Sequence, residues 1–247
     1  MKIAFCGKGG VGKSTLASLT CYALLAKGYQ VLAIDADPSP HLARLLGFRE
    51  EKIVPLAEMR ELLAERAQKN GPFYVLNPHV EDLPEKFMLR KGALRLMVLG
   101  AIRVAGAGCA CPEQTVLRHL LTLLLLEAKE AVVLDMEAGV EHFGRGTVAS
   151  VDHLLVVVQP YRGSIETAQR IGQLARQLGI EQVHFVGNAL RSPEDQSFLE
   201  EALGHKLLAS FFWEESLAKA ERQGKPLGEI DAGAHKEVLK MLSKLEA

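Results

Sequence analysis

The chain has 247 residues, 48% of them hydrophobic, with a formal net charge of −1 and a sequence pI near 6.7. This length and apolar content suit one large α/β domain, so we expect residues 1–247 to form a single domain. The balanced charge gives no basic footprint for nucleic acid, and the longest apolar run, residues 120–126, is far too short to span a membrane. We expect a cytoplasmic protein without a signal peptide that binds neither nucleic acid nor membranes.

The first expected elements are an apolar strand over residues 2–6 and a helix over residues 16–27, joined by the glycine-rich loop GKGGVGKST. This loop fits the phosphate-binding pattern G-x-x-x-x-G-K-[ST] in its required context. Glycines let backbone N–H groups approach a phosphate, and the helix N-terminus adds partial positive charge. The pattern predicts that Lys13 contacts the β- and γ-phosphates of ATP or ADP and that Ser14 holds Mg²⁺. The expected nucleotide-binding residues here are Gly9, Gly10, Val11, Gly12, Lys13, Ser14 and Thr15.

A second lysine, Lys8, lies inside the loop and cannot easily fold back onto the phosphates of that loop. The stretch KGGVGKST resembles the deviant Walker A loop of the MinD, ParA and nitrogenase iron protein class. The resemblance implies that Lys8 reaches across a two-fold axis to the nucleotide of a partner subunit, and therefore that the protein dimerises with ATP. The alternative is a solvated loop lysine.

A second apolar strand is expected over residues 30–34, after a helix that ends at Gly28. Strand, helix and strand imply a parallel pair, so Asp35 and Asp37 lie at the carboxyl end of the sheet, where α/β proteins bind ligands. By resemblance this segment, residues 35–38, is switch I. There Asp37 orients the attacking water or acts as a base, and Asp35 lies close to the magnesium. The alternative is a helix cap, which suits Asp35 better than Asp37; the role of His41 stays open.

Farther along we expect a charged helix over residues 56–69, an ordered loop over residues 77–84 and a strand over residues 94–99. A glycine-rich run then leads into Cys109-Ala110-Cys111-Pro112, ahead of a helix over residues 113–129. We refer to residues 108–112 as the Cys-x-Cys segment.

Cys109 and Cys111 place two soft thiolates close enough together for one metal ion. Two ligands are too few, but a two-fold dimer supplies four, which suits Zn²⁺, Ni²⁺ or an iron–sulfur cluster at the dimer interface. Taken alone the pattern is weak, because buried inert cysteines are common. We interpret Cys6 and Cys21 as such core residues.

A strand over residues 131–134 delivers Asp135, which is expected to bind Mg²⁺ through water, and Gly139 is expected to sense the γ-phosphate through its N–H. Residues 135–146 then form switch II. Glu137, Glu141 and His142 are either transient metal ligands or, as we favour, switch and interface contacts.

The remaining strands are expected over residues 154–158, 183–186 and 207–212, with helices over residues 164–178 and 235–245. The amphipathic last helix is expected to pack against the domain rather than on a membrane. The alternation predicts an α/β fold, a doubly wound and mostly parallel sheet with helices on both faces, as in P-loop NTPases. By resemblance Asn188 recognises adenine, although Ala189 replaces the usual lysine and Phe212 a usual proline, which indicates altered adenine packing.

Three strings narrow the resemblance: NPHVEDLP at residues 77–84, GCACPE at residues 108–113 and DMEAGVEHFGRG at residues 135–146. Together they resemble the CooC-type accessory ATPases, which serve nickel insertion into carbon monoxide dehydrogenase, and the similarity spans residues 1–227. The resemblance implies a dimeric ATPase with ATP or ADP, Mg²⁺, and Ni²⁺ or Zn²⁺ at the dimer interface. The carbon monoxide dehydrogenase apoprotein is then the partner.

Three alternatives stay open. The AcsF proteins, which act in acetyl-CoA synthase maturation, are similar enough to fit the same strings. An iron–sulfur ATP-dependent reductase component, like the nitrogenase iron protein, would also use a thiolate-bridged dimer, although its cysteines are widely spaced. A positioning ATPase of the MinD or ParA type gives no reason for the Cys-x-Cys segment.

Overall fold

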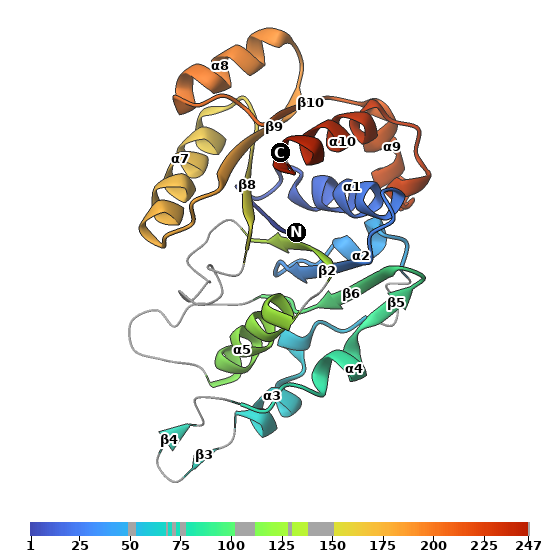
Figure 1. Ribbon diagram of the computed structural model, residues 1–247, viewed down its shortest axis with the longest axis vertical. Helices are drawn as coiled ribbons and strands as arrows, with labels where there is room; N and C mark the ends of the chain where they lie inside the picture. Colours follow the sequence, from blue (N-terminus) through green and yellow to red (C-terminus); the bar gives the residue numbers. More distant parts are fainter. Residues whose placement is uncertain are drawn as a thin grey trace.

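An eight-stranded sheet with strand order β10-β9-β8-β1-β7-β2-β6-β5 forms the centre of the computed structural model (Figure 1). The structure describes residues 1–48, 53–67, 69–70, 73–74, 78–101, 112–127, 130–137 and 151–246. The sheet strands are β1 (Lys2–Cys6), β2 (Val31–Ala36), β5 (Leu89–Lys91), β6 (Leu94–Val98), β7 (Ala131–Met136), β8 (His153–Val158), β9 (Val183–Leu190) and β10 (Ala209–Phe212). A separate two-stranded pair consists of β3 (Lys69–Asn70) and β4 (Phe73–Tyr74).

The described helices are interspersed with the strands along the chain. They are α1 (Lys13–Ala26), α2 (Leu42–Leu45), α3 (Arg60–Arg66), α4 (Leu83–Phe87), α5 (Pro112–Glu127), α7 (Arg162–Gln177), α8 (Pro193–Leu203), α9 (Glu215–Arg222) and α10 (Gly233–Leu245), with short 3₁₀ turns η2 (Leu56–Glu58) and η3 (Leu227–Glu229). Every neighbouring pair in the sheet is parallel except β5 and β6. The predicted doubly wound, mostly parallel architecture is confirmed.

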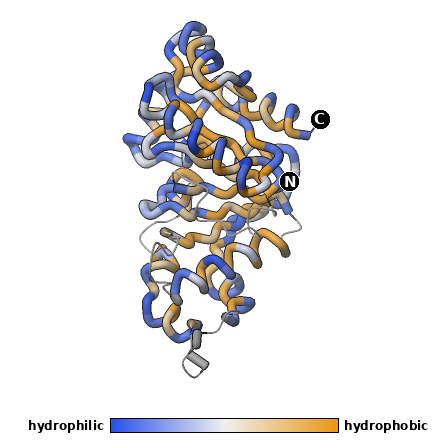
Figure 2. The backbone as a smooth tube through the Cα atoms, turned by 90° about the vertical axis from the view of Figure 1, so that its left-hand side faces the viewer, coloured by the Kyte–Doolittle hydropathy of each residue, from blue (hydrophilic) through white to orange (hydrophobic). Residues whose placement is uncertain are grey.

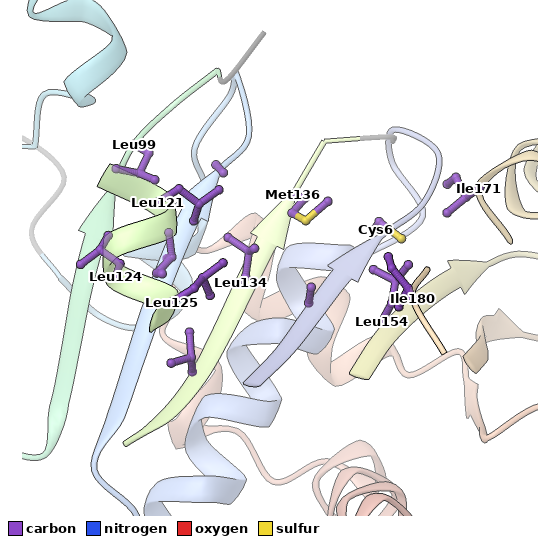
Figure 3. Close-up of a cluster of buried hydrophobic side chains, with 14 of the residues drawn as sticks. Cys6, Leu99, Leu121, Leu124, Leu125, Leu134, Met136, Leu154, Ile171 and Ile180 are labelled. Atoms are coloured by element: carbon purple, nitrogen blue, oxygen red, sulfur yellow. The ribbon is translucent and has the colours of Figure 1, made fainter. Parts of the chain in front are cut away.

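Helices cover both faces of the sheet, and each face has its own apolar cluster. Helices α1 and α10 pack together on one face, whereas α5 and α7 cover the other. The central strands are buried on both sides, as their continuous apolar runs require. The backbone is accordingly hydrophobic through its inner layers and more hydrophilic outside (Figure 2). In the α5 layer, Leu121 and Leu125 point toward Leu134 of β7, and Cys6 lies farther along the same layer (Figure 3).

Several predicted element bounds were wrong. The expected helix over residues 56–69 is the turn η2 followed by α3, separated at Met59, whose ψ of 64° is not helical. The expected loop over residues 77–84 ends in α4, because Pro84 is tolerated in a first helical turn, where its missing N–H is not needed. Strand β5, which the sequence did not predict, is a three-residue edge strand in which Arg90 and Lys91 are charged and exposed, as is typical of sheet edges.

The last helix packs against the domain, as predicted. In α10, Val238, Met241 and Leu242 are buried against α1 and β10. Leu239, in the same helix, is 39% exposed. Within the described ranges, no helix combines the length and apolarity needed to cross a lipid bilayer.

Candidate nucleotide site

The glycine-rich loop leaves the carboxyl end of β1 in the middle of the sheet. Gly7 (φ +142°) and Gly12 (φ +91°) have backbone conformations that side chains disfavour. A Cβ at Gly7 would lie 2.4 Å from the carbonyl oxygen of Val157, and one at Gly12 would lie 2.3 Å from Nδ2 of Asn188. Both positions therefore require glycine, and the loop is held closely against β8 and β9.

Helix α1 begins at Lys13 itself, three residues earlier than predicted. Ser14 and Thr15 thus lie in its first turn, where backbone N–H groups have no partner inside the helix and can bind phosphate. The Lys13 side chain is only 6% exposed. Its Nζ donates to the carbonyl oxygen of Lys8 at 3.5 Å and lies 3.9 Å from Oδ2 of Asp37. The structure thus brings together the predicted phosphate lysine and the predicted catalytic aspartate.

Asp35 holds switch I through the backbone. Its Oδ1 accepts from the N–H of Asp37 at 3.1 Å, and its Oδ2 accepts from the N–H of Leu42, the first residue of α2, at 3.0 Å. This geometry favours the helix-capping interpretation of Asp35 over the magnesium one. Burial raises the pKa of Asp35 to about 6, against the opposing effect of these two hydrogen bonds. His41, just before α2, is exposed.

Asp135 is fully buried on β7, in register with Asp35 on β2. Neither of its carboxylate oxygens has a hydrogen-bond partner among the described residues. Burial, together with the charge of Asp35, raises the pKa of Asp135 to about 8, against the opposing effects of Ser14 and Lys13. Ser14 interacts with this carboxylate without meeting strict hydrogen-bond geometry. An unpartnered buried carboxylate near a hydroxyl is an oxygen donor set that fits Mg²⁺.

Asp37 is the more accessible acid, with 21% of its side chain exposed. Its Oδ1 accepts from the N–H of Ser39 at 2.9 Å, which fixes the carboxylate in a local turn. Its Oδ2 faces Lys13. The group is therefore oriented toward the loop and reachable by water.

Asn188, predicted to recognise adenine, lies inside β9 and contacts the loop. Its Nδ2 donates to the carbonyl oxygen of Val11 at 2.7 Å. The next residue, Ala189, has φ +54°, where the pairing of β9 with β10 shifts register. At the end of β10, Phe212 and Trp213 are 44% and 45% exposed, and the Arg191 guanidinium lies 4.5 Å from the Trp213 ring centroid. The sequence did not reveal that Asn188 supports the loop, since the two partners are 177 residues apart.

Several predicted site residues lie outside the described residues: Gly139, Glu141, His142, Cys109 and Cys111. Within the part of the chain that is described, no group of three or more potential metal ligands occurs. Glu137, the last described residue of its segment, is half-buried. The interpretation of Cys6 and Cys21 as core residues is confirmed, because both side chains are fully buried and burial raises the pKa of the Cys21 thiol.

A cavity of about 530 Å³ lies between Pro38 of switch I and the first turn of α5, where Glu113 and Gln114 line it. The N–H of Gly100 donates to the carbonyl oxygen of Asp35 at 3.2 Å. One residue on, the carbonyl oxygen of Ala101 accepts from Nε2 of Gln114 at 3.4 Å. The predicted switch I and the start of α5 are therefore connected through residues 100–101, which follow β6.

The known proteins that this chain resembles include nucleotide-binding and ATP-binding proteins, in agreement with the phosphate-binding loop. Residues 3–227 match the CobQ/CobB/MinD/ParA nucleotide binding domain family. The carbon monoxide dehydrogenase accessory protein CooC of Rhodospirillum rubrum is 42% identical over 231 residues, which cover 91% of this chain and 88% of that protein. An uncharacterised ATP-binding protein of Methanocaldococcus jannaschii is 39% identical over 250 residues, covering 98% and 96% of the two chains.

Among solved structures, MinD of Pyrococcus horikoshii with Mg-ADP superposes with a TM-score of 0.70 at 17% identity, covering 99% of this chain and 95% of that one. MinD in the MinC:MinD complex of Aquifex aeolicus gives a TM-score of 0.69 at 22% identity, with the same coverage. These likenesses show the fold. The chain therefore belongs to the CobQ/CobB/MinD/ParA nucleotide-binding domain family of P-loop ATPases and, within it, to the group of CooC.

Proposed function

We propose that the protein is a homodimeric, cytoplasmic ATPase that carries nickel to carbon monoxide dehydrogenase and inserts it into the active-site cluster. The observation that carries the proposal is the position of α5: it begins directly after Cys111 and is connected to switch I through Gly100 and Gln114. The relationship to CooC supports the choice of client. Residues 1–247 then act as one ATPase domain with the Cys-x-Cys segment inside it.

In the ATPase reaction, Lys13 neutralises charge on the β- and γ-phosphates, and loop N–H groups together with Thr15 hold the phosphate chain. Ser14 and Asp135 are the residues that would hold Mg²⁺, with Asp35 behind them. When bound, Mg²⁺ neutralises charge that develops on the phosphates. Asp37 accepts a hydrogen bond from the attacking water and then its proton. Asn188 contacts the adenine, and the N–H of Gly139 contacts the γ-phosphate.

In this proposal, dimerisation completes both the nucleotide site and the metal site. Lys8 of each subunit reaches the nucleotide of the other, and Cys109 with Cys111 of both subunits give four thiolates, a set suited to Ni²⁺ or Zn²⁺. ATP binding closes the dimer and sets the thiolates, and hydrolysis at switch I changes their geometry through the Gly100–Gln114 connection and through β7. Metal is then released to the client.

An anaerobic nickel titration, combined with mass determination in solution, tests the metal site. We expect one tight Ni²⁺ per dimer, and loss of that site in Cys109→Ser/Cys111→Ser, because removing all four thiolates leaves no ligand set. Nucleotide binding is the internal control and should persist in the variant. Unchanged nickel binding in the variant, or none in the native protein, would contradict the proposal. A brown chromophore with inorganic sulfide would instead favour the iron–sulfur alternative.

A further inference from the structure

Lys8 already has a binding place within its own subunit. Its side chain crosses to the loop between β8 and α7, where Nζ lies 5.3 Å from the centroid of the Tyr161 ring. A Cβ on Gly163 would lie 2.6 Å from that Nζ. The ammonium group therefore occupies a notch formed by the face of an aromatic ring and the backbone of a glycine.

The notch is fixed by hydrogen bonds of the loop itself. The N–H of Tyr161 donates to the carbonyl oxygen of Gln159 at 2.7 Å, and the N–H of Gln159 donates to Oγ of Ser164 at 3.0 Å. The carbonyl oxygen of Tyr161 accepts from the N–H of Ser164 in the first turn of α7. These hydrogen bonds hold the backbone that carries the Tyr161 ring, and the residue remains accessible because it is 40% exposed.

The interaction is weak enough to be reversible. The contact of a cation with an exposed aromatic face shifts an equilibrium by only about two- to five-fold, and the partial positive charge at the N-terminus of α7 offsets part of that gain. The backbone of Lys8 is held separately, because its carbonyl oxygen accepts from Nζ of Lys13. The side chain of Lys8 is thus able to leave the notch while the loop stays in place.

We propose that Tyr161 and Gly163 form a holding site for Lys8 in the free subunit, and that Lys8 must leave this site to reach the nucleotide of a partner subunit. The inference rests on the proposed function, in which Lys8 acts across the dimer. Tyr161 is then a positioning residue: the contact that it makes is lost on dimerisation, so it opposes association of free subunits.

The first test observes the free subunit directly. Lysines are labelled by ¹³C-methylation, which keeps their charge, and the Lys8 signal is assigned with Lys8→Arg. We expect the Tyr161 ring to shift this signal, the shift to persist in Tyr161→Phe, and the shift to vanish in Tyr161→Leu. A Lys8 signal that is the same in the Leu and Phe variants would overturn the proposal.

The second test measures the dimer dissociation constant with ATP by sedimentation. Tyr161→Leu should tighten the dimer by about two- to five-fold, the size of an exposed cation–π contact, and Tyr161→Phe should match the native protein. Gly163→Ala should behave like Tyr161→Leu, because its methyl group displaces Nζ while alanine favours the helix. Weaker or unchanged association in both Tyr161→Leu and Gly163→Ala would overturn the holding site.

The variant Lys8→Ala distinguishes failure of the proposed role of Lys8 across the dimer from failure of the holding site. If Lys8→Ala dimerises with ATP as the native protein does, Lys8 has no role across the dimer and that part of the proposed function fails. If Lys8→Ala loses ATP-dependent dimerisation while the Tyr161 and Gly163 variants behave like the native protein, only the holding site fails.

Discussion

Asp37→Asn is expected to lower kcat for ATP hydrolysis by about two to four orders of magnitude, the usual contribution of a positioned general base. ATP binding should persist, because the amide has the same size and Lys13 is unchanged. The geometry behind this expectation is the orientation of the carboxylate: Oδ1 is fixed by the N–H of Ser39, and Oδ2 lies 3.9 Å from Nζ of Lys13. Separate measurements of phosphate release and of nucleotide affinity check that hydrolysis is lost while ATP binding is retained.

A matched control for this variant is Asp152→Asn. Asp152 is 54% exposed and lies just before β8, at the amino ends of the strands, where its Oδ2 accepts from the N–H of Lys2. Its substitution should leave hydrolysis unchanged. Hydrolysis at the native rate in Asp37→Asn would show that Asp37 is not the residue that activates water.

Asp135→Asn is expected to stabilise the nucleotide-free protein and to abolish Mg²⁺-dependent hydrolysis. Asp135 is fully buried without a hydrogen-bond partner among the described residues, so its charge is costly to bury in the absence of a cation. A gain in Tm on the order of 5 °C at pH 8 corresponds to a few kcal/mol for a chain of this size. Loss of function with gain of stability is typical of a site residue that is satisfied only by its ligand.

The pH dependence of this gain has a definite sign. Burial raises the pKa of Asp135 from 3.8 to about 8, so between these values the folded protein binds more protons than the unfolded chain. The stability of the native protein therefore falls as the pH rises through this window. Because asparagine does not titrate, the Tm difference between variant and native protein should grow from pH 5 to pH 8 in calorimetry without Mg²⁺. A variant that is less stable across this range would contradict the account.

The sequence was sufficient for the parts of the site that depend on local pattern and topology. The loop and its flanking strand and helix are one continuous segment, and the apolar runs before Asp35 and Asp135 predict strands that are buried on both faces. In parallel strands, residues at the carboxyl ends meet, so the proximity of the acids follows from the fold. The observed register of Asp35 with Asp135 agrees with this.

Other features depend on contacts between distant segments and have no local signal. The sequence around Asn188 does not indicate that its side-chain amide donates a hydrogen bond to Val11. Likewise, the sequence around Tyr161 does not indicate that its ring faces Lys8. The hydrogen bond from the N–H of Leu42 to Asp35 joins residues that are nearer in sequence, but it depends on how the chain turns after β2. Short elements such as β5 and α4 bury too little apolar surface to produce a periodic pattern.

The central claim is that ATP turnover delivers nickel from thiolates of this protein to its client. The most direct measurement is anaerobic activation of nickel-deficient carbon monoxide dehydrogenase by the nickel-loaded protein, compared with nickel-deficient acetyl-CoA synthase. We predict recovery of carbon monoxide oxidation with native protein and ATP, little recovery with Asp37→Asn, and none with Cys109→Ser/Cys111→Ser beyond that given by free Ni²⁺. Equal activation by the native protein and the cysteine variant, or activation of acetyl-CoA synthase alone, would contradict the account.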